Sequence, residues 1–309
     1  MSLFALLCGC GVPHPQRMHD PQGIAAQYPG DRGIQSDPAV IYFGTFESDS
    51  WYLDWGTSTK PANADVVHTD ASRLFVPLEG KALRIRIEQG SNAGIGATFQ
   101  FMRHIGEEPD DIYFRYYLRF ADDWHPLIDG GKLPGPAGTY DRAGWGGRRS
   151  DGTNGWSARG HFGIQASRLT PIGFYVYHAD QPTQYGDIWV WDKRNLGHLL
   201  NNRWYCVEHH VKLNTPTRRD GVLRAWIDGQ LAFAKADVRF RDLETLKIET
   251  IWLNVYHGGT AVAASDHHLY IDNVVIARSY IGPMKARESS ASTLRASPGN
   301  PFARLRSRG

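Results

Sequence analysis

The sequence predicts an all-β protein, an antiparallel β-sandwich of the jelly-roll or concanavalin-like type with a groove on one sheet. Short runs of alternating residue type recur between turn signals along most of the 309 residues. The dipeptide Asp228-Gly229 separates two such runs, and both central positions of a tight hairpin favour residues that accept positive φ. The chain also contains ten Trp and fourteen Tyr, residue types that suit half-buried strands.

About ten strands are expected, each alternating over roughly 5 to 10 positions as one strand of a half-buried antiparallel sheet does. Two segments, 242–249 and 195–200, have compositions that favour short helices instead. The strand-like runs are Val40–Ser48, Ala82–Gln89, Ala97–Arg103, Asp111–Phe120, 161–168, 172–180, 187–192, Arg203–Thr215, 222–240, 249–259 and 268–279.

The chain divides into one folded domain, residues 38–283, and two flanking segments. The opening MSLFALLCGCG resembles the end of a bacterial lipoprotein signal, with Cys10 as the residue expected to carry a lipid anchor. Residues 11–37 are rich in Pro, Gln and Gly, which is typical of a linker. We therefore expect an exported protein that is periplasmic, anchored to the outer membrane or secreted. No apolar stretch is long enough to predict a transmembrane helix.

Positive charge is concentrated at the C-terminal end of the sequence. Residues 284–309 contain one Lys and five Arg against one Glu, a net charge of +5, which leaves −3 for the rest of a chain whose total is +2. This segment is also rich in Ser, Ala and Pro, so we expect a disordered basic tail. The nearly neutral body excludes the basic surface that nucleic-acid binding requires.

Polar residues two positions apart on a strand identify a candidate site. Ser157 and Arg159 have this spacing, and so do Tyr175 and Tyr177, so each pair projects to one side of a sheet. Lys132 stands alone among glycines in the stretch Asp129–Phe162, which is too rich in Gly to be a helix and is expected to form a loop. Two such pairs can share one groove together with this lysine.

These residue types suit the β-elimination of a uronate polymer. A base removes the acidic proton next to the carboxylate, and an acid protonates the leaving glycosidic oxygen. Lys and Arg can neutralise the carboxylate, and Arg does so in bidentate fashion. A Tyr can act as base and acid if nearby cations lower its pKa from about 10. The five residues are therefore a chemically sufficient catalytic set that needs no metal and no cofactor.

The order of three motifs, GGKLPG, SxR and YxY, resembles the family 14 polysaccharide lyases, jelly-roll enzymes known mainly as alginate lyases. The likeness extends from Val40 to Ile281 and includes NRWYCVEHHVKLNTP and DGVLRAWIDGQ. The first of these has Asn where the family pattern has Gly. The segment VYHGG also lacks an expected aromatic residue, and the segment after GKLPG is unusually rich in Arg and Trp.

The resemblance implies a role for each matching residue. It makes Lys132, Ser157, Arg159, Tyr175 and Tyr177 the catalytic set, with Tyr177 favoured as the acid/base. Three nearby histidines are alternative bases and, with other neighbours, are expected to bind substrate. This substrate-binding group is Trp156, His161, Gln165, His178, Tyr256 and His257.

The implied partner is an anionic polysaccharide, with mannuronate-rich alginate as the first choice and a monomeric enzyme as the expected form. Glucuronan or a bacterial capsular uronate is the alternative substrate. A non-catalytic carbohydrate-binding sandwich and a glycoside hydrolase also stay open. Hydrolysis requires two carboxylates that flank the bond, and no strand shows a Glu-x-Asp-x-Glu run that would supply them.

Overall fold

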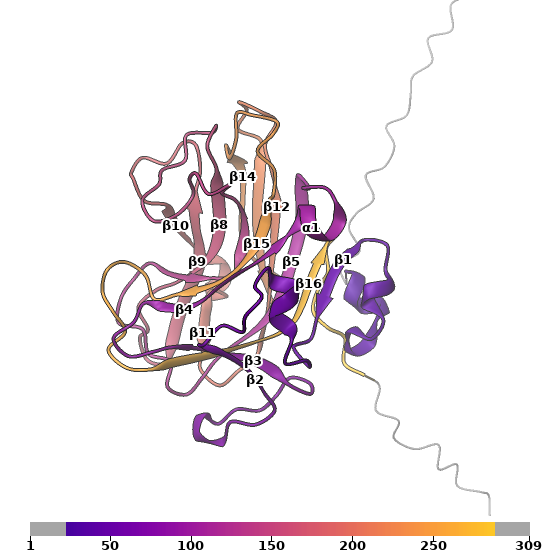
Figure 1. The fold of residues 1–309 in the computed structure, drawn as a ribbon, viewed down its shortest axis with the longest axis vertical. Coiled ribbons are helices and arrows are strands. Elements are labelled where there is room, and N and C mark those ends of the chain that lie inside the picture. The colour runs from indigo at the N-terminus through magenta and orange to yellow at the C-terminus, as the bar shows by residue number, and fades with distance from the viewer. Residues whose placement is uncertain (1–22, 288–309) are drawn as a thin grey trace, which may run out of the picture.

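The structure, a computed structural model, describes residues 23–287. The chain forms two antiparallel sheets of eight strands each. Figure 1 shows the two sheets packed against each other. The predicted sandwich is therefore confirmed. The predicted lipid anchor at Cys10 and the basic tail from residue 288 onward lie outside the described residues.

The first sheet has the order β14-β13-β12-β5-β16-β3-β2, and β1 pairs with the far half of β16. Its central strands are long and continuous, because β5 pairs with β12 over eight consecutive residues. The strands are β1 (Val40–Gly44), β2 (Ala64–Val67), β3 (Ala82–Ile87), β5 (Asp111–Phe120), β12 (Tyr205–Lys212), β13 (Gly221–Ile227), β14 (Gln230–Val238) and β16 (His267–Ala277).

The second sheet has the order β10-β9-β8-β6-β15-β4, with β11 on β9 and β7 between β15 and β8. It carries all of the residues that the sequence singled out as catalytic. The strands are β4 (Ala93–Gln100), β6 (Gly131–Leu133), β7 (Gly135–Gly138), β8 (Trp156–Phe162), β9 (Leu169–Tyr177), β10 (Asp187–Val190), β11 (His198–Leu200) and β15 (Thr250–Tyr256).

One hydrophobic core fills the space between the sheets. Alternate residues of each strand face it, for example Phe114 and Leu118 from the first sheet and Phe174 and Val176 from the second, all with no exposed surface. The residues between them face outward. The Asp228-Gly229 hairpin that joins β13 to β14 is confirmed, because both residues have positive φ, 50° and 77°.

Several predicted elements need correction. Residues 161–168 are not one strand, because β8 ends at Phe162 and a loop follows. Residues 101–103, assigned to the end of a strand, belong to the α-helix α1 (Phe101–Ile105). The expected helix at 195–200 is instead the end of a 3₁₀ turn and strand β11. Six 3₁₀ turns complete the described structure: η1 (Ile24–Gln27), η2 (Pro29–Asp31), η3 (Ile34–Ser36), η4 (Trp51–Trp55), η5 (Ala71–Arg73) and η6 (Lys193–Asn195).

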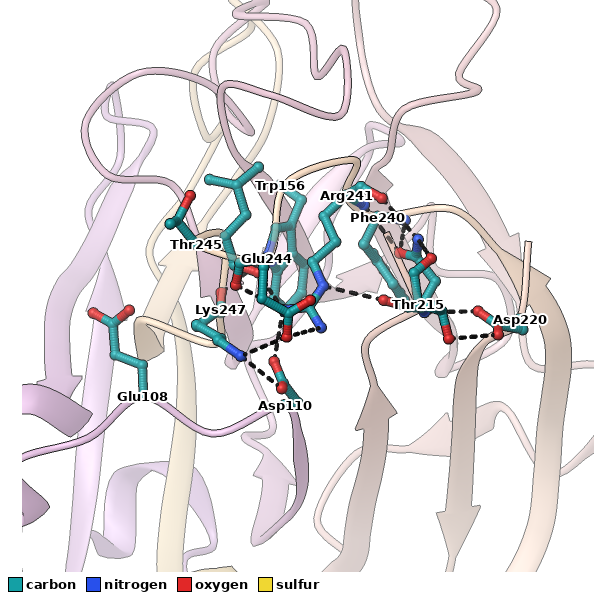
Figure 2. Close-up of polar contacts among 12 residues, drawn as sticks. Glu108, Asp110, Trp156, Thr215, Asp220, Phe240, Arg241, Glu244, Thr245 and Lys247 are labelled. Carbon is teal, nitrogen blue, oxygen red and sulfur yellow. Dashed lines mark hydrogen bonds and ion pairs between the residues drawn. The ribbon is translucent and has the colours of Figure 1, made fainter. Parts of the chain in front are cut away.

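The expected helix at 242–249 is replaced by an irregular turn, because side chains from other elements bind its backbone. The Arg241 guanidinium donates to the Leu246 carbonyl oxygen at 2.8 Å, and the Trp156 indole donates to the Lys247 carbonyl oxygen at 3.1 Å. Asp110 accepts from both Arg241 and Lys247 at 2.7 Å (Figure 2). These tertiary contacts satisfy the carbonyls that helical hydrogen bonds would otherwise use.

Residues 23–37, assigned to a linker, form three 3₁₀ turns that lie against the outer face of the first sheet, beside β1 and β16 in Figure 1. Ile24 and Ile34 pack there with Tyr113 and Val275. Composition gave no sign of this packing, since the segment buries only a few apolar side chains. None of the helices found between residues 23 and 287 has the length and apolar character that crossing a bilayer requires.

A fully buried ion pair holds this segment in place. Asp31 accepts from both terminal nitrogens of Arg115 on β5, and both side chains have no exposed surface. Arg115 also donates to the Gly282 carbonyl oxygen at 3.1 Å, so it connects the N-terminal segment to the last described residues. Removal of Asp31 would leave an uncompensated charge inside the protein.

We therefore expect Asp31→Ala to lower the free energy of unfolding by about 3–5 kcal/mol, the usual cost of breaking a buried ion pair. The double variant that also carries Arg115→Met should regain much of the lost stability, because no unpaired charge then remains. Urea unfolding measures both effects. Asp49→Ala, at an exposed position, is the control. Equal stability of Asp31→Ala and Asp49→Ala would contradict the role given to the pair.

Candidate active site

The outer face of the second sheet, called the site face below, brings the predicted catalytic residues together. On the paired strands β8 and β9, Ser157 lies opposite Tyr177 and Arg159 lies opposite Tyr175. Lys132 on β6 lies opposite His161 on β8 and Tyr256 on β15. Cross-strand partners point to the same side of a sheet, so residues from four strands share this face.

Lys132 is the most perturbed cation of the site. It lies on a short strand and not in the surface loop that its glycine neighbours suggested, and it is only 8% exposed. Its Nζ atom donates to the Gly130 carbonyl oxygen and lies 4.0 Å from the centre of the Tyr175 ring. Burial and the nearby Arg159 guanidinium lower the pKa of Lys132 to about 7. The amine is therefore largely neutral above this pH.

Arg159 is held in a fixed position beside Lys132. It donates from Nη1 to Asn254 Oδ1 at 3.0 Å, and its guanidinium carbon lies 4.7 Å from the centre of the Trp252 ring. The side chain is 4% exposed, and its Nε has no partner within the described part of the chain. Burial lowers the pKa of Arg159 to about 10, so the group remains a cation near neutral pH.

The two tyrosines differ in their surroundings. Their rings lie 5.7 Å apart. The Tyr177 hydroxyl accepts a hydrogen bond from the Gly147 backbone N–H at 3.0 Å, so the turn that contains Gly147 covers this hydroxyl. Burial and the neighbouring Tyr177 raise the pKa of Tyr175 above its ordinary value. The expectation that nearby cations lower a tyrosine pKa is therefore wrong for Tyr175, because desolvation outweighs the attraction of Arg159.

His161 lies at one end of the row of site-face residues. Its Nε2 lies 3.1 Å from Asp129 Oδ1 and accepts from the Gly130 backbone N–H at 3.2 Å. Burial lowers the pKa of His161 to about 4, so the imidazole is neutral at the pH where Lys132 loses its proton. Ser157 closes the other end, where its hydroxyl donates to the Gly144 carbonyl oxygen at 2.6 Å.

Four predicted substrate-binding residues do not reach the site face. Trp156 alternates with Ser157 and is therefore fully buried in the core against Phe240, as Figure 2 shows. His178 follows Tyr177 and turns to Asp187 and Trp189. Two others are held by neighbours away from this face. The Gln165 amide donates to Thr170 and Asn201, and His257 packs against His267.

Two site residues were missed by the sequence analysis. Trp252 and Asn254 on β15 share the site face with Tyr256, and both contact Arg159. The signal was present, because Trp252, Asn254 and Tyr256 follow one another at every second position. No group of three or more His, Cys, Asp or Glu side chains suited to a metal ion occurs between residues 23 and 287.

Gly258 allows the loop that carries Gly130 to approach closely. Its φ is +101°, and a Cβ at this position would lie 2.6 Å from the Gly130 carbonyl carbon. Gly259 also has a positive φ, +59°, but a Cβ there would meet nothing within 4 Å. A side chain at either position would strain the backbone, but only a side chain at Gly258 would also collide with another backbone segment.

We expect Gly258→Ala to lower the free energy of unfolding by about 2 kcal/mol more than Gly259→Ala does, because only the first forces two backbone segments apart. Thermal unfolding of the two variants provides the comparison. Equal losses would mean that the loop at Gly130 moves aside without cost.

Comparison with known proteins agrees with the architecture. Residues 77–273, well over half of the chain, match the family model Polysaccharide lyase 14. No match is found among curated proteins.

Solved structures share the fold at low sequence identity. A variant of alginate lyase Aly36B, with a lysine and a tyrosine replaced by alanine and with alginate tetrasaccharide bound, has a TM-score of 0.60 and 19% identity over 78% of this chain and 95% of that chain. The family 14 alginate lyase of Aplysia kurodai has a TM-score of 0.60 and 18% identity, over 77% of this chain and 98% of that chain. The endo-β-1,4-glucuronan lyase of the fungus Trichoderma reesei has a TM-score of 0.52 and 14% identity, over 80% of this chain and 100% of that chain.

The family match includes the strands that carry Lys132, Arg159 and Tyr175. The solved structures are two-sheet enzymes of the same architecture, although their identities to this chain establish the fold alone. The chain therefore belongs to polysaccharide lyase family 14 and is a polysaccharide lyase.

Proposed function

We propose that this lyase cleaves a uronate polymer by β-elimination, with mannuronate-rich alginate as the first candidate. Three observations support the proposal. The site face carries two cations and two phenols, solved structures of the same fold include alginate lyases, and one of these binds an alginate oligosaccharide after loss of a lysine and a tyrosine. Glucuronan is the second candidate, because a glucuronan lyase shares the fold.

The observation that carries the proposal is the environment of Lys132. It is a buried amine that forms no ion pair with any described carboxylate and lies directly over the Tyr175 ring. A structural lysine is normally exposed or paired, because burying an unpaired charge is costly. A buried amine with a pKa near 7 is instead suited to accept a proton at neutral pH.

The chemistry then divides among three side chains. Arg159 binds the substrate carboxylate and stabilises the negative charge that develops when the adjacent carbon loses its proton. The neutral Lys132 amine accepts that proton. The Tyr175 phenol, whose raised pKa keeps it protonated, donates its proton to the glycosidic oxygen as the bond breaks and a carbon–carbon double bond forms. Proton transfer from the Lys132 ammonium to the Tyr175 phenolate restores both groups.

Tyr177 has a supporting role in this scheme, although the family pattern favours it as the acid/base. Its hydroxyl is already engaged by the Gly147 N–H, and its side chain is 1% exposed. It contacts the Tyr175 ring and thereby fixes the ring that lies under Lys132. We therefore assign Tyr177 to positioning and Tyr175 to proton donation.

A hydrolytic mechanism has little support in the site. The side chains that face outward from the described strands β6, β8, β9 and β15 around Lys132 include no pair of carboxylates, which hydrolysis of a glycosidic bond requires. The acidic group Asp129 contacts His161 at the rim.

Incubation of the purified protein with a panel of uronate polymers tests the proposed function. Elimination creates a double bond conjugated to the carboxylate, so we expect a rise in ultraviolet absorbance, fastest with mannuronate-rich alginate. A faster rise in absorbance with glucuronan than with alginate would identify glucuronan as the preferred substrate. Reducing ends that appear without absorbance would indicate hydrolysis and contradict the proposal.

The pH dependence of kcat/KM tests Lys132 as the base. Since the amine must be deprotonated, kcat/KM should rise about tenfold per pH unit below pH 7 and level off above it. Lys132→Met should lower the plateau by at least about 100-fold. The same variant should also melt at a higher temperature than the wild type, by a difference that grows as the pH falls from 10.5 toward 7 and is fully present below pH 7. The folded wild type must release the Lys132 proton in the first range and bury its charge in the second. A flat profile, or activity in Lys132→Met, would remove this residue from proton transfer.

Phenylalanine substitutions distinguish the two tyrosines, because each keeps the ring and removes only the oxygen. Tyr175→Phe should lower kcat by about 100-fold or more, whereas Tyr177→Phe should cost about tenfold. The ultraviolet assay measures both, and thermal unfolding confirms that both variants fold. The reverse order of losses would make Tyr177 the proton donor.

A further inference from the structure

A five-residue turn, Gly144–Arg148, lies against one end of the site face and is called the Trp145 turn below. It closes on itself, because the Gly144 N–H donates to the Arg148 carbonyl oxygen at 2.9 Å and the Arg148 N–H donates to the Trp145 carbonyl oxygen at 2.8 Å. It belongs to the segment rich in Arg and Trp that departs from the family pattern. The catalytic scheme above gives its side chains no role.

Two hydrogen bonds fix the turn to the site face. The Gly147 N–H donates to the Tyr177 hydroxyl at 3.0 Å, and the Ser157 hydroxyl donates to the Gly144 carbonyl oxygen at 2.6 Å. Tyr177 and Ser157 are cross-strand partners, so the turn is anchored over one position of the sheet. Its remaining side chains therefore lie at a constant distance from the reacting groups.

Arg148 is an exposed cation with its donors available. Its guanidinium carbon lies 4.4 Å from the centre of the Trp145 ring, which restricts its motion. In the part of the chain that the structure describes, its side chain has no ion pair and no hydrogen bond, whereas the neighbouring Arg149 donates to the Gln181 carbonyl oxygen at 2.7 Å. Arg149 has a structural contact, and Arg148 has none except its stacking.

Tyr185 completes the surroundings of the turn. A Cβ built at Gly147 would lie 3.2 Å from a carbon of the Tyr185 ring, so the two segments are in contact. Tyr185 is nevertheless 58% exposed, which is unusual for a large aromatic residue. The turn carries a free guanidinium and the adjoining segment carries an exposed ring, so together they can offer a carboxylate partner and a flat apolar surface. A uronate residue presents both a carboxylate and a pyranose face.

We propose that the Trp145 turn and Tyr185 form a subsite for one uronate residue beyond the cleavage point, with its carboxylate on Arg148 and its pyranose ring on Tyr185. This inference rests on the proposed function, because it assumes that the substrate is a uronate polymer. Trp145 is a positioning residue, since it acts by holding the Arg148 guanidinium. The subsite contributes to substrate binding and not to proton transfer.

The chain offers a matched control for Arg148. Arg203 also stacks on an aromatic ring, with its guanidinium carbon 4.6 Å from the centre of the Tyr205 ring, but it pairs with Asp228 at 3.0 Å. It lies next to β12 of the first sheet, away from the site face. Arg203→Ala therefore removes the same kind of side chain from a position that contacts no proposed substrate.

Steady-state kinetics on the preferred uronate polymer test the subsite. We expect Arg148→Ala to raise KM about tenfold, the loss of one charge-assisted contact, while kcat stays within about twofold. The KM of Arg148→Lys should lie between those of the wild type and Arg148→Ala, because an ammonium keeps the charge but not the bidentate geometry. Tyr185→Ala should also raise KM, and Arg203→Ala should change neither constant.

Two results would overturn the inference. One is a KM for Arg148→Ala equal to that of the wild type. The other is an equal loss of kcat and thermal stability, which would make the turn a structural support for Tyr177 only. If the wild type releases no unsaturated product from any uronate polymer, the proposed function fails. Calorimetric binding of alginate to wild type and Arg148→Ala then decides the subsite, which is refuted if both bind equally.

Discussion

The two-residue repeat of a pleated strand is the constraint on which the site depends. Because β8 pairs with β9 in one register, Ser157, Arg159, Tyr175 and Tyr177 face outward while Ala158 and Val176 fill the core. If β8 shifted by one residue, Ala158 would face outward and Arg159 would be buried between the sheets. The apolar residues that stabilise the sandwich therefore also fix the geometry of the chemistry.

The site maintains positive charge without a matching negative charge. Lys132 lies close enough to Arg159 that the guanidinium disfavours protonation of the amine, and no described carboxylate pairs with either of them. This arrangement is unfavourable in the free protein, since both groups are more than nine-tenths buried. An anionic substrate would supply the negative charge that Arg159 lacks in the free protein.

The sequence predicted the sandwich, and local alternation placed Ser157 with Arg159 and Tyr175 with Tyr177 on one face of a sheet, because both inferences depend on nearby residues only. Alternation alone could also have excluded Trp156 and His178, since each is adjacent to a residue of the site face. Lys132 was assigned to a loop because glycines surround it, and its strand forms only by pairing with β8 and β15. The packing of residues 23–37 depends on Asp31 meeting Arg115, 84 residues along the chain, a long-range contact that composition does not encode.

Both ends of the described chain lie on the outer face of the first sheet. The Ile24 N–H donates to the Tyr280 carbonyl oxygen at 3.0 Å, and the Gly30 N–H donates to the Lys285 carbonyl oxygen at 2.9 Å, while the catalytic residues lie on the outer face of the other sheet. The full thickness of the sandwich thus separates residues 24–30 and 280–285 from the site face. An affinity handle or solid support attached next to these residues would face away from the proposed catalytic residues, so an immobilised form of this enzyme would still present them to a dissolved polymer.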